Sequence, residues 1–423
     1  MTGASVQKHQ YQGTVEAVLP GGDSLVHCGQ DSILVANGVP GDKVLVRELR
    51  KRRGIKRGEI IKVMAPSSTR VEPSCSVAHK CGGCSFQFMP VRQQADIKSA
   101  WVKQAFKQLV QPDTQWFPVV GDTIYLRRRV RWQIGQDETG WFLGFFEPAS
   151  HQPVRQDCCP VITPELQRLR RMLEQRTLSG IDAVQAVQLV DGMHVIIESA
   201  TTPDSLLMNG GESVGVEIQW WWRDSHHTKP LARPVKKFHD ELPVGSSSLS
   251  LVIGPDDFVQ GQFEGNRALI LQIQEWCGKL SRIADLFCGC GNLSLPLAAL
   301  TGASVYGAEY CEASVRVASK NAKRLGVKGQ FVSANLFEDF DIEPYIGADV
   351  LILDPPRRGA KRICHQMQYL LPKKIIMISC DPAAGARDGA LLASHGFRLK
   401  ALKALDFFSY AGHVETASLW EPV

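Results

Sequence analysis

Residues 282–292 read RIADLFCGCGN, in which an apolar segment runs into a turn containing Gly289 and Gly291. The apolar residues predict a buried strand, and the two glycines allow the backbone to turn tightly and to approach a ligand closely. Residues 293–300, LSLPLAAL, follow directly and predict a helix. A strand, a glycine turn and a helix in this order indicate a ligand site at the start of an α/β unit. The third glycine of the dinucleotide fingerprint is missing, which disfavours a nicotinamide cofactor.

The segments on either side of this turn alternate between helix and strand patterns. A helix pattern precedes it at 268–280, and a second helix pattern lies at 313–326. Strand patterns follow the turn at 304–309, 329–334, 348–354 and 374–379. This alternation predicts a parallel, doubly wound α/β sheet in the C-terminal part of the chain.

Polar residues stand where three of these strands end, namely Glu309, Asn335 and Asp354. Each could be a helix cap or a turn former when taken alone. Because the carboxyl ends of parallel strands meet at one edge of the sheet, we expect the three to converge on a ligand. A carboxylate at Glu309 could accept hydrogen bonds from both ribose hydroxyls, and Asn335 would lie near an adenine. Together they favour a nucleoside-containing ligand.

Cys380 follows the apolar segment KKIIMIS and begins the turn DPAAGARD. A single cysteine in such a place is more often a packed apolar residue than a nucleophile. Its position beside the predicted crevice nevertheless allows it to react, and Lys373, Lys374 and Arg387 could lower its pKa. The upstream motif VLILDPPRRG has Arg357 where adenine-N6 methyltransferases carry an aromatic residue.

The N-terminal part has a different pattern. Between Tyr11 and Met64 short apolar runs alternate with glycine and proline turns, which predicts a small β-barrel. Seven basic residues lie within eleven positions, opposed locally by Glu48 alone: Arg47, Arg50, Lys51, Arg52, Arg53, Lys56 and Arg57. A solvated loop is one interpretation of this run, and RNA contact by the barrel is the favoured one.

The middle of the chain mixes a helix with β-rich segments. Residues 92–110 place apolar side chains at four-residue spacing, which predicts a helix, and residues 226–243 are expected to form a long loop. Strands are expected at 123–146, where basic residues alternate with aromatic ones: Arg127, Arg128, Arg129 and Arg131 among Tyr125, Trp132, Trp141 and Phe142. Such a segment suits single-stranded RNA, and equally a sheet whose aromatic residues face its own core.

Twelve cysteines are present, and three of them, Cys75, Cys81 and Cys84, are clustered. With Cys159 further along, they could enclose either a zinc ion or an iron–sulfur cluster. Cys158 is adjacent and could replace Cys159. The remaining six are expected to pack as small apolar residues: Cys28, Cys277, Cys288, Cys290, Cys311 and Cys364.

Length and composition limit the class of protein. A chain of 423 residues is too long for one core, so two or three domains are expected. With 44% hydrophobic and 22% charged residues, no apolar run near the roughly 18 needed to span a membrane and no secretory signal, we expect a monomer in the cytoplasm. The net charge of +5 is too small to indicate nucleic-acid binding by itself.

Four motifs occur in order: DLFCGCGN at 285–292, DPPRRG at 354–359, SCDPAAGARD at 379–388 and GHVET at 412–416. In this combination the chain resembles the RNA uracil-C5 methyltransferases, whose signatures have the forms DxFCGxGx, DPPRxG, SCxPxxxxRD and HxE. The resemblance covers nearly the whole chain. Its barrel is similar to a TRAM domain, and CGGC with a later CP matches the members that carry a [4Fe–4S] cluster.

This resemblance implies three domains. They are a TRAM/OB-like RNA-binding barrel at 10–68, a central β-rich iron–sulfur and RNA-recognition domain at 69–90 and 120–255, and a class I methyltransferase domain at 91–119 and 256–423. It also implies a cluster held by Cys75, Cys81, Cys84 and Cys159. Methyl transfer from S-adenosylmethionine needs no electron, so the cluster is expected to serve structure and RNA recognition.

The resemblance further assigns the chemistry. Cys380 is implied to be the nucleophile that adds to uracil C6, and Glu415 the base that removes the C5 proton after methyl transfer. The target nucleotide is expected to be flipped out of its stack. The residues implied to hold S-adenosylmethionine are Gln260, Phe287, Asn292, Glu309, Asn335 and Asp354.

The barrel and the cluster together resemble the ribosomal members, so the expected target is a uridine of 23S rRNA, free or in an assembling subunit. Another rRNA or tRNA uridine, and a non-catalytic RNA-binding assembly factor, are the alternatives. The sequence departs from the family pattern at Gln262, at Asp381 and at Ser409-Tyr410, where asparagine, asparagine and proline are usual. These departures leave the nucleophile and the base in place but could alter target choice or cofactor affinity.

Overall fold

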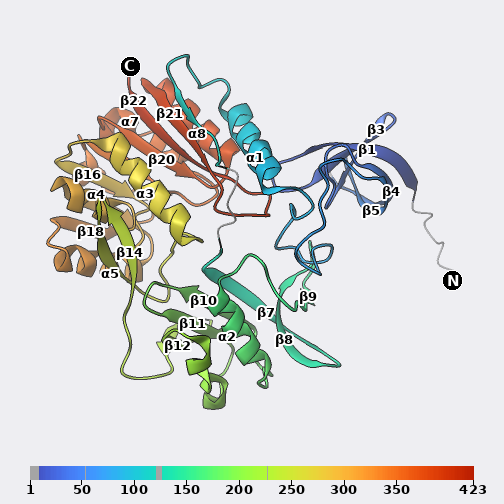
Figure 1. Cartoon of the computed structure of the whole chain (residues 1–423). Coiled ribbons are helices and arrows are strands. Elements are labelled where there is room, and N and C mark those ends of the chain that lie inside the picture. Colours follow the sequence, from blue (N-terminus) through green and yellow to red (C-terminus); the bar gives the residue numbers. More distant parts are fainter. Residues whose placement is uncertain (1–8, 53, 121–125, 226) are drawn as a thin grey trace.

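The computed structural model describes residues 9–52, 54–120, 126–225 and 227–423. Its strands form a closed barrel, a seven-stranded sheet, a two-stranded hairpin and an eight-stranded sheet. In Figure 1 the barrel stands to one side, and the helix α1 (Val91–Phe106) lies between it and the eight-stranded sheet. Within the described ranges, no helix combines the length and the apolar character that crossing a bilayer requires.

The barrel has five strands: β1 (Gln10–Val18), β2 (Ser24–Cys28), β3 (Asp31–Val35), β4 (Lys43–Arg52) and β5 (Ile55–Ala65). They close in the order β1-β2-β3-β5-β4. Val15, Val26, Ile33 and Val44 fill the interior because alternate residues of each strand point inward. The predicted small barrel is confirmed, and a closed five-stranded barrel fits an OB-like domain.

The basic run on β4 and β5 is more neutralised than its sequence suggested. Ion pairs join Arg47 to Glu59, Lys56 to Asp31 and Arg57 to Asp23. Glu48 is therefore not the sole opposing charge, because strand pairing brings in carboxylates from other parts of the barrel. Arg53 and the side chains of residues 50–52 lie outside the described part.

The seven-stranded sheet has the order β13-β12-β11-β10-β7-β8-β9. Its strands are β7 (Arg129–Asp137), β8 (Gly140–Phe146), β9 (Pro153–Val154), β10 (Ala183–Gln188), β11 (Met193–Glu198), β12 (Ile218–Arg223) and β13 (Thr228–Pro230). The helix α2 (Pro164–Glu174) packs on it, followed by the short helices η1 (Ser205–Met208) and η2 (Gly211–Val214). Trp132 and Trp220 lie in the core beneath α2. For these aromatic residues, the interpretation as core packing is confirmed; Tyr125 lies outside the described residues.

The expected long loop at 226–243 is wrong in two places, because Thr228–Pro230 form the strand β13 and a second strand occupies the end of the range. Residues Phe238–Val244 form β14, which pairs with β15 (Ser247–Ile253). Phe238, Asp240 and Leu242 are buried alternately along β14, a strand pattern that the neighbouring lysines, histidines and prolines obscured. The hairpin packs on the helices α3 (Phe263–Cys277) and α4 (Ser294–Thr301), and its apolar residues share their core.

The eight-stranded sheet has the order β18-β17-β16-β19-β20-β22-β21-β6. Its strands are β6 (Gln115–Phe117), β16 (Arg282–Leu286), β17 (Ser304–Glu309), β18 (Gly329–Ser333), β19 (Val350–Leu353), β20 (Ile375–Ser379), β21 (Phe397–Leu405) and β22 (Glu415–Pro422). β16 to β20 are parallel and β22 runs antiparallel between β20 and β21. The predicted doubly wound sheet is confirmed.

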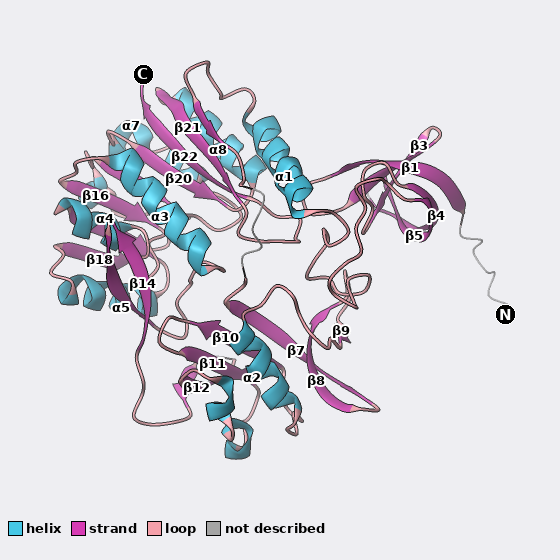
Figure 2. Cartoon of the chain, viewed as in Figure 1, coloured by secondary structure: helices cyan, strands magenta, loops and turns pink. Residues whose placement is uncertain are grey.

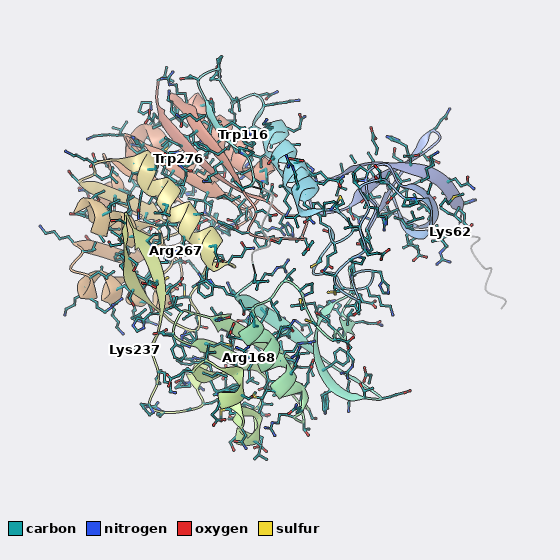
Figure 3. All side chains as sticks on the ribbon, in the orientation of Figure 1. Lys62, Trp116, Arg168, Lys237, Arg267 and Trp276 are labelled. Carbon is teal, nitrogen blue, oxygen red and sulfur yellow. The ribbon has the colours of Figure 1, made fainter. Side chains whose placement is uncertain are left out.

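Helices cover both faces of this sheet (Figure 2). Ile283 points to the face covered by α3, α4 and α5 (Glu312–Arg324), and Ala284 to the face covered by α1, η3 (Glu343–Tyr345), α6 (Lys361–Cys364), α7 (Met367–Leu370) and α8 (Pro382–Ser394). Burying one such aliphatic side chain stabilises the fold by roughly 1.5–3 kcal/mol. Trp276 of α3 and Trp116 of β6, labelled in Figure 3, pack at the β6 edge.

Candidate active site

A cavity of about 720 Å³ opens at the carboxyl ends of the parallel strands. The eight residues given catalytic or cofactor-binding roles from the sequence all line it: Gln260, Phe287, Asn292, Glu309, Asn335, Asp354, Cys380 and Glu415. The topology explains six of them, because β16, β17, β18, β19 and β20 are parallel and the turns that follow them lie at the same edge of the sheet. Glu415 begins the antiparallel strand β22 at that edge, and Gln260 lies in the segment before α3.

The glycine turn after β16 has the tight backbone that its sequence predicted, with an additional left-handed residue at Phe287. Phe287 has a φ of +69°, and Gly289 and Gly291 have φ of +53° and +88°. A left-handed conformation at a phenylalanine is uncommon and is maintained here by hydrogen bonds from the amides of Phe287 and Cys288 to the carbonyl of Ala308, at 2.9 and 3.1 Å. The turn is therefore locked to the neighbouring strand β17.

Glu309 is oriented by two backbone amides. Its Oε2 accepts from the amide of Gly289 at 3.2 Å, and its Oε1 accepts from the amide of Cys311 at 3.0 Å. Each carboxylate oxygen keeps a free lone pair for a ligand hydroxyl. On the other side of the turn, Asn292 and Asn266 exchange two side-chain hydrogen bonds of 2.9 Å, which fix Asn292 at the cavity wall.

Gln260 is held by Arg128, a residue for which the sequence left RNA contact and packing in a sheet equally open. Arg128 is fully buried; its Nε donates to the carbonyl of Gln260 at 2.8 Å and its Nη1 to Asp240 Oδ2 at 2.8 Å. An RNA-contacting role for Arg128 is therefore wrong, because its guanidinium is enclosed between the central sheet and the cavity wall. The side chain of Gln260 donates to Asp354 Oδ2 at 3.5 Å.

Three carboxyl groups lie close together at this end of the sheet, of which Asp285 and Glu415 are buried and Asp354 is half-buried. Burial raises the pKa of Asp285 and of Asp354 to about 7, with the charge of Glu309 adding to the shift in both. Burial and the charge of Asp354 raise the pKa of Glu415 to about 8. A cationic ligand would relieve this mutual repulsion, so the cavity favours a positively charged group near Asp354.

Cys380 is half-buried directly after β20. Its pKa is raised by burial and by the charge of Glu415, and Arg357 opposes this shift. Lys373, Lys374 and Arg387 do not supply the expected lowering of its pKa, because each is bound elsewhere: to Asp349, to Glu421 and to Asp388.

Strand pairing brings the thiol and the carboxyl group together. Ser379 at the end of β20 pairs with Thr416 of β22, so Cys380 and Glu415 lie next to each other across the two strands. Glu415 is 5% exposed, and its Oε2 has no hydrogen-bond partner among the residues that the structure describes. A buried, unpartnered carboxylate oxygen with a pKa near 8 is suited to accept a proton.

The departure at Asp381 has a local explanation. Its Oδ1 accepts from the amides of Ala383 and Ala384, at 2.9 and 3.2 Å, and so caps the N-terminus of α8. Asparagine and aspartate are equally good N-caps. The replacement therefore preserves the turn that presents Cys380.

Sequence reasoning gave no role to several other residues that line the cavity: Phe258, Asp285, Tyr310, Phe337 and Arg358. The guanidinium of Arg358 lies 3.1 Å from the ring centroid of Phe337, whose ring is 5.4 Å from that of Phe287. Asp285 and Arg358 lie within quoted motifs and could have been found there. Phe337 follows a strand without any motif, so no sequence signal identified it.

The cysteines of the second predicted site lie near one another, away from this cavity. Burial raises the pKa of Cys75, of Cys81 and of Cys159, and the charge of Cys84 adds to each shift. Cys159 is buried, whereas Cys158 is exposed and its Sγ accepts from Gln167 Nε2 at 3.1 Å. Over the described ranges, no three or more histidine, cysteine or acidic side chains are arranged to hold a metal ion.

Comparison with known proteins agrees with this geometry. The family described as Methyltransferase small domain matches residues 256–373. The 23S rRNA (uracil(1939)-C(5))-methyltransferase RlmD of Vibrio parahaemolyticus is 30% identical over 95% of this chain and 93% of its own length. The RlmD of Pectobacterium atrosepticum is also 30% identical, over 96% and 92%.

Among solved structures, the tRNA (uracil-54, C5)-methyltransferase of Pyrococcus abyssi in complex with S-adenosyl-L-homocysteine superposes with a TM-score of 0.75. It covers 97% of this chain and 99% of its own at 19% identity, which shows a common fold. The resemblance found in the sequence motifs is confirmed by the full-length relatives. The chain belongs to the RlmD family of 23S rRNA (uracil(1939)-C(5))-methyltransferases.

Proposed function

We propose that this protein transfers a methyl group from S-adenosylmethionine to C5 of a specific uridine in 23S rRNA. The observation that carries the proposal is the pairing of Cys380 with Glu415 in one cavity, beside the glycine turn of a methyltransferase sheet. A thiol alone could be a packed apolar residue. A thiol next to a proton acceptor of raised pKa, both facing the same cavity, supports covalent catalysis.

The cavity fits the methyl donor. Glu309, fixed by two amides, would accept the ribose hydroxyls, and Asn335 with Phe337 would border the adenine. The carboxyl group of Asp354 would face the positive charge of the donor. When bound, S-adenosylmethionine supplies an electrophilic methyl group on a sulfonium.

The protein residues divide the reaction into an addition and an elimination. Uracil C5 is too weakly nucleophilic to take a methyl group unaided, so the Cys380 thiolate adds to C6 and the electron pair moves to C5. Arg357, which opposes the rise in the pKa of Cys380, stabilises the thiolate. After C5 has taken the methyl group, Glu415 removes the C5 proton, the C5–C6 double bond returns and the thiolate leaves.

A [4Fe–4S] cluster held by Cys75, Cys81, Cys84 and Cys159 is part of the proposal. These thiols are buried or half-buried, and they lie close enough for their charges to raise the pKa of Cys75, Cys81 and Cys159. Both features support binding of one cluster by all four. The exposure of Cys158 and its bond from Gln167 favour Cys159 as the fourth ligand. The cluster would tie residues 75–84 to the central sheet and help to form an RNA-binding surface.

The remaining units are proposed to bind RNA. The OB-like barrel would act as a TRAM domain at 10–68, with the central domain at 69–90 and 120–255 and the methyltransferase domain at 91–119 and 256–423. The β14-β15 hairpin, which packs on α3 and α4, is better counted with the methyltransferase domain. We propose that the protein acts as a monomer in the cytoplasm, on free 23S rRNA or an assembling subunit.

Trapping with 5-fluorouridine RNA tests the catalytic proposal. When C5 carries fluorine, no proton is available to Glu415, so the Cys380–C6 bond formed before methyl transfer cannot break. The expected result is a denaturation-resistant protein–RNA species that requires S-adenosylmethionine and is absent in Cys380→Ala. Absence of this species with all ribosomal and transfer RNAs tried would favour a non-catalytic assembly factor. Mapping 5-methyluridine in cells lacking the gene would identify the target uridine.

A further inference from the structure

The loop at 406–414 connects β21 to β22 and ends directly before Glu415. No described residue donates a hydrogen bond to Glu415 Oε2, so the backbone that carries Glu415 must determine where this oxygen points. The loop contains Ser409 and Tyr410, where the family pattern has proline. Its conformation therefore depends on contacts made elsewhere in the chain.

The first of these contacts is a buried ion pair with α1. The side chain of Lys98 is 0% exposed and that of Asp406 13% exposed. Lys98 Nζ donates to Asp406 Oδ2 at 2.7 Å and to the carbonyl of Phe408 at 3.0 Å. The amide of Phe408 donates back to Asp406 Oδ1 at 2.9 Å. One buried ammonium thus closes the start of the loop into a fixed turn.

The second contact involves the segment that carries the clustered cysteines. The carbonyl of Tyr410 accepts from the amides of Ser85 and Phe86, at 2.8 and 2.9 Å. The amide of Tyr410 donates to Gln94 Oε1 of α1 at 3.2 Å. Tyr410 has a φ of +63°, a left-handed conformation that is unfavourable for a non-glycine residue. The three hydrogen bonds hold it in place.

The third contact reaches the barrel. The amide of Gly21 donates to the carbonyl of Gly412 at 2.8 Å. A Cβ atom at Gly412 would lie 2.3 Å from the amide nitrogen of Gly22, so the two turns touch backbone to backbone. The loop before Glu415 is therefore bound to α1, to the cysteine segment and to the barrel.

We infer that Lys98 is a positioning residue for Glu415, acting through Asp406 and the loop. The inference rests on the proposed function. The groups used for attack by Cys380 and for methyl transfer lie outside the loop and are linked to it by the bond between Arg357 Nη2 and His413 Nδ1 at 3.1 Å, whereas removal of the C5 proton uses Glu415, which directly follows the loop. Loss of the Lys98–Asp406 pair should therefore slow the elimination more than the addition.

Lys98→Met tests this by separating the two steps. Adduct formation on 5-fluorouridine RNA reports the addition and methyl transfer, and turnover on ordinary RNA also requires the elimination. We expect the adduct yield to stay within about twofold and turnover to fall at least ~10-fold, since small misplacements of a reacting group cost up to ~10²-fold. A covalent species carrying labelled methyl should accumulate on ordinary RNA, as it should in Glu415→Gln.

Two further variants keep the test decisive. Arg70→Met removes one partner of another buried ion pair, with Asp42 at 2.5 Å, and should not accumulate the covalent species. Asp406→Asn keeps an acceptor for the amide of Phe408 but removes both the charge and the Oδ2 acceptor that Lys98 uses, so it should show the Lys98→Met pattern, even if Lys98→Met does not fold.

Three results would overturn the inference. The first is a parallel fall of adduct yield and turnover in Lys98→Met without accumulation of a covalent species. The second is unchanged turnover in the Lys98 and Asp406 variants. The third is reduced turnover with accumulation of the covalent species in Arg70→Met. Absence of any adduct in the wild-type protein would instead refute the proposed function.

Discussion

The cavity and the cysteine group are built in different ways. The cavity collects side chains from the ends of neighbouring strands of one sheet, so its composition follows from strand order. The cysteine group joins residues 75–84, which contain no strand, to Cys159, which lies just before α2. Chemistry at strand ends can be read from motifs, whereas a site joining distant loops depends on contacts that bring those loops together.

The largest effect is expected at the nucleophile. Cys380→Ala removes the proposed nucleophile, so methyl transfer should fall on the order of 10⁴-fold or more. Cys364→Ala removes a buried thiol on α6 outside the cavity and is the matched control. Incorporation of labelled methyl into RNA measures both. Equal activity of the two variants would show that the cavity is not a covalent site.

Glu415→Gln should affect one half of the reaction. Turnover should fall by about 10²–10⁴-fold, the usual contribution of a general base, while the methylated covalent species accumulates. In the wild-type protein, release of product should speed up as the pH rises through about 8, because the base must first lose its proton. In single-turnover experiments the glutamine variant should lose this dependence. A wild-type rate of release that is flat between pH 6 and 9 would contradict the assignment.

The same carboxyl group predicts a change in stability. Its pKa of about 8 in the folded protein exceeds its ordinary value of 4.5, so the folded state holds the proton more tightly than the unfolded state. The wild-type protein therefore loses stability as the pH rises from 4.5 towards 8, and Glu415→Gln should lose less, because the Glu415 contribution is gone and those of Asp285 and Asp354 remain. Thermal unfolding without ligand should show the variant to be the more stable at pH 9, with the difference shrinking towards pH 5. The reverse order would contradict the burial of this group.

At the cysteine group we expect a structural effect. Cys81→Ser should destabilise the protein by ~2–5 kcal/mol, the scale of losing a structural cross-link, and weaken RNA binding in parallel. Cys158→Ser should be close to wild type if Cys159 is the fourth ligand. Unfolding and RNA-binding measurements on both variants check this. A Cys81→Ser protein that keeps its fold and RNA affinity but cannot methylate would contradict a structural role.

The smallest effect is expected on the barrel. Lys62 lies on its exposed surface, far from the large sheet (Figure 3). If this surface contacts RNA phosphates, Lys62→Ala should weaken binding uniformly and reduce the slope of log affinity against log salt by about 1. Arg47→Ala should change the slope less, because Arg47 already pairs with Glu59. Unchanged slopes in both would place the RNA elsewhere.

Most of the fold and the lining of the cavity could be predicted from the sequence. Alternating strands and helices determine the doubly wound sheet; its strand pattern places Glu309, and the motifs place Asp354 and Cys380, at strand ends. The environment of Arg128 could not be predicted in this way. It stands in a basic, aromatic segment that suggests RNA contact, but it is buried against Asp240, a residue on a strand that was expected to be loop.

The charges that act on Cys380 and the ion pairs near the site could not be predicted from neighbouring residues in the sequence either. The lysines next to Cys380 in the chain point to other partners, and Arg357, which lies after another strand, acts on the thiol instead. The Lys98–Asp406 pair joins residues that no motif connects. Such pairs depend on tertiary packing, which the periodicity of a single segment does not encode.

The most direct test is mass spectrometry of the species trapped on 5-fluorouridine 23S rRNA. After digestion we predict one cross-linked peptide, joined through Cys380 to a fluorouridine that carries an added methyl group. A link through another residue, or a trapped nucleotide without the methyl group, would contradict the proposed covalent mechanism.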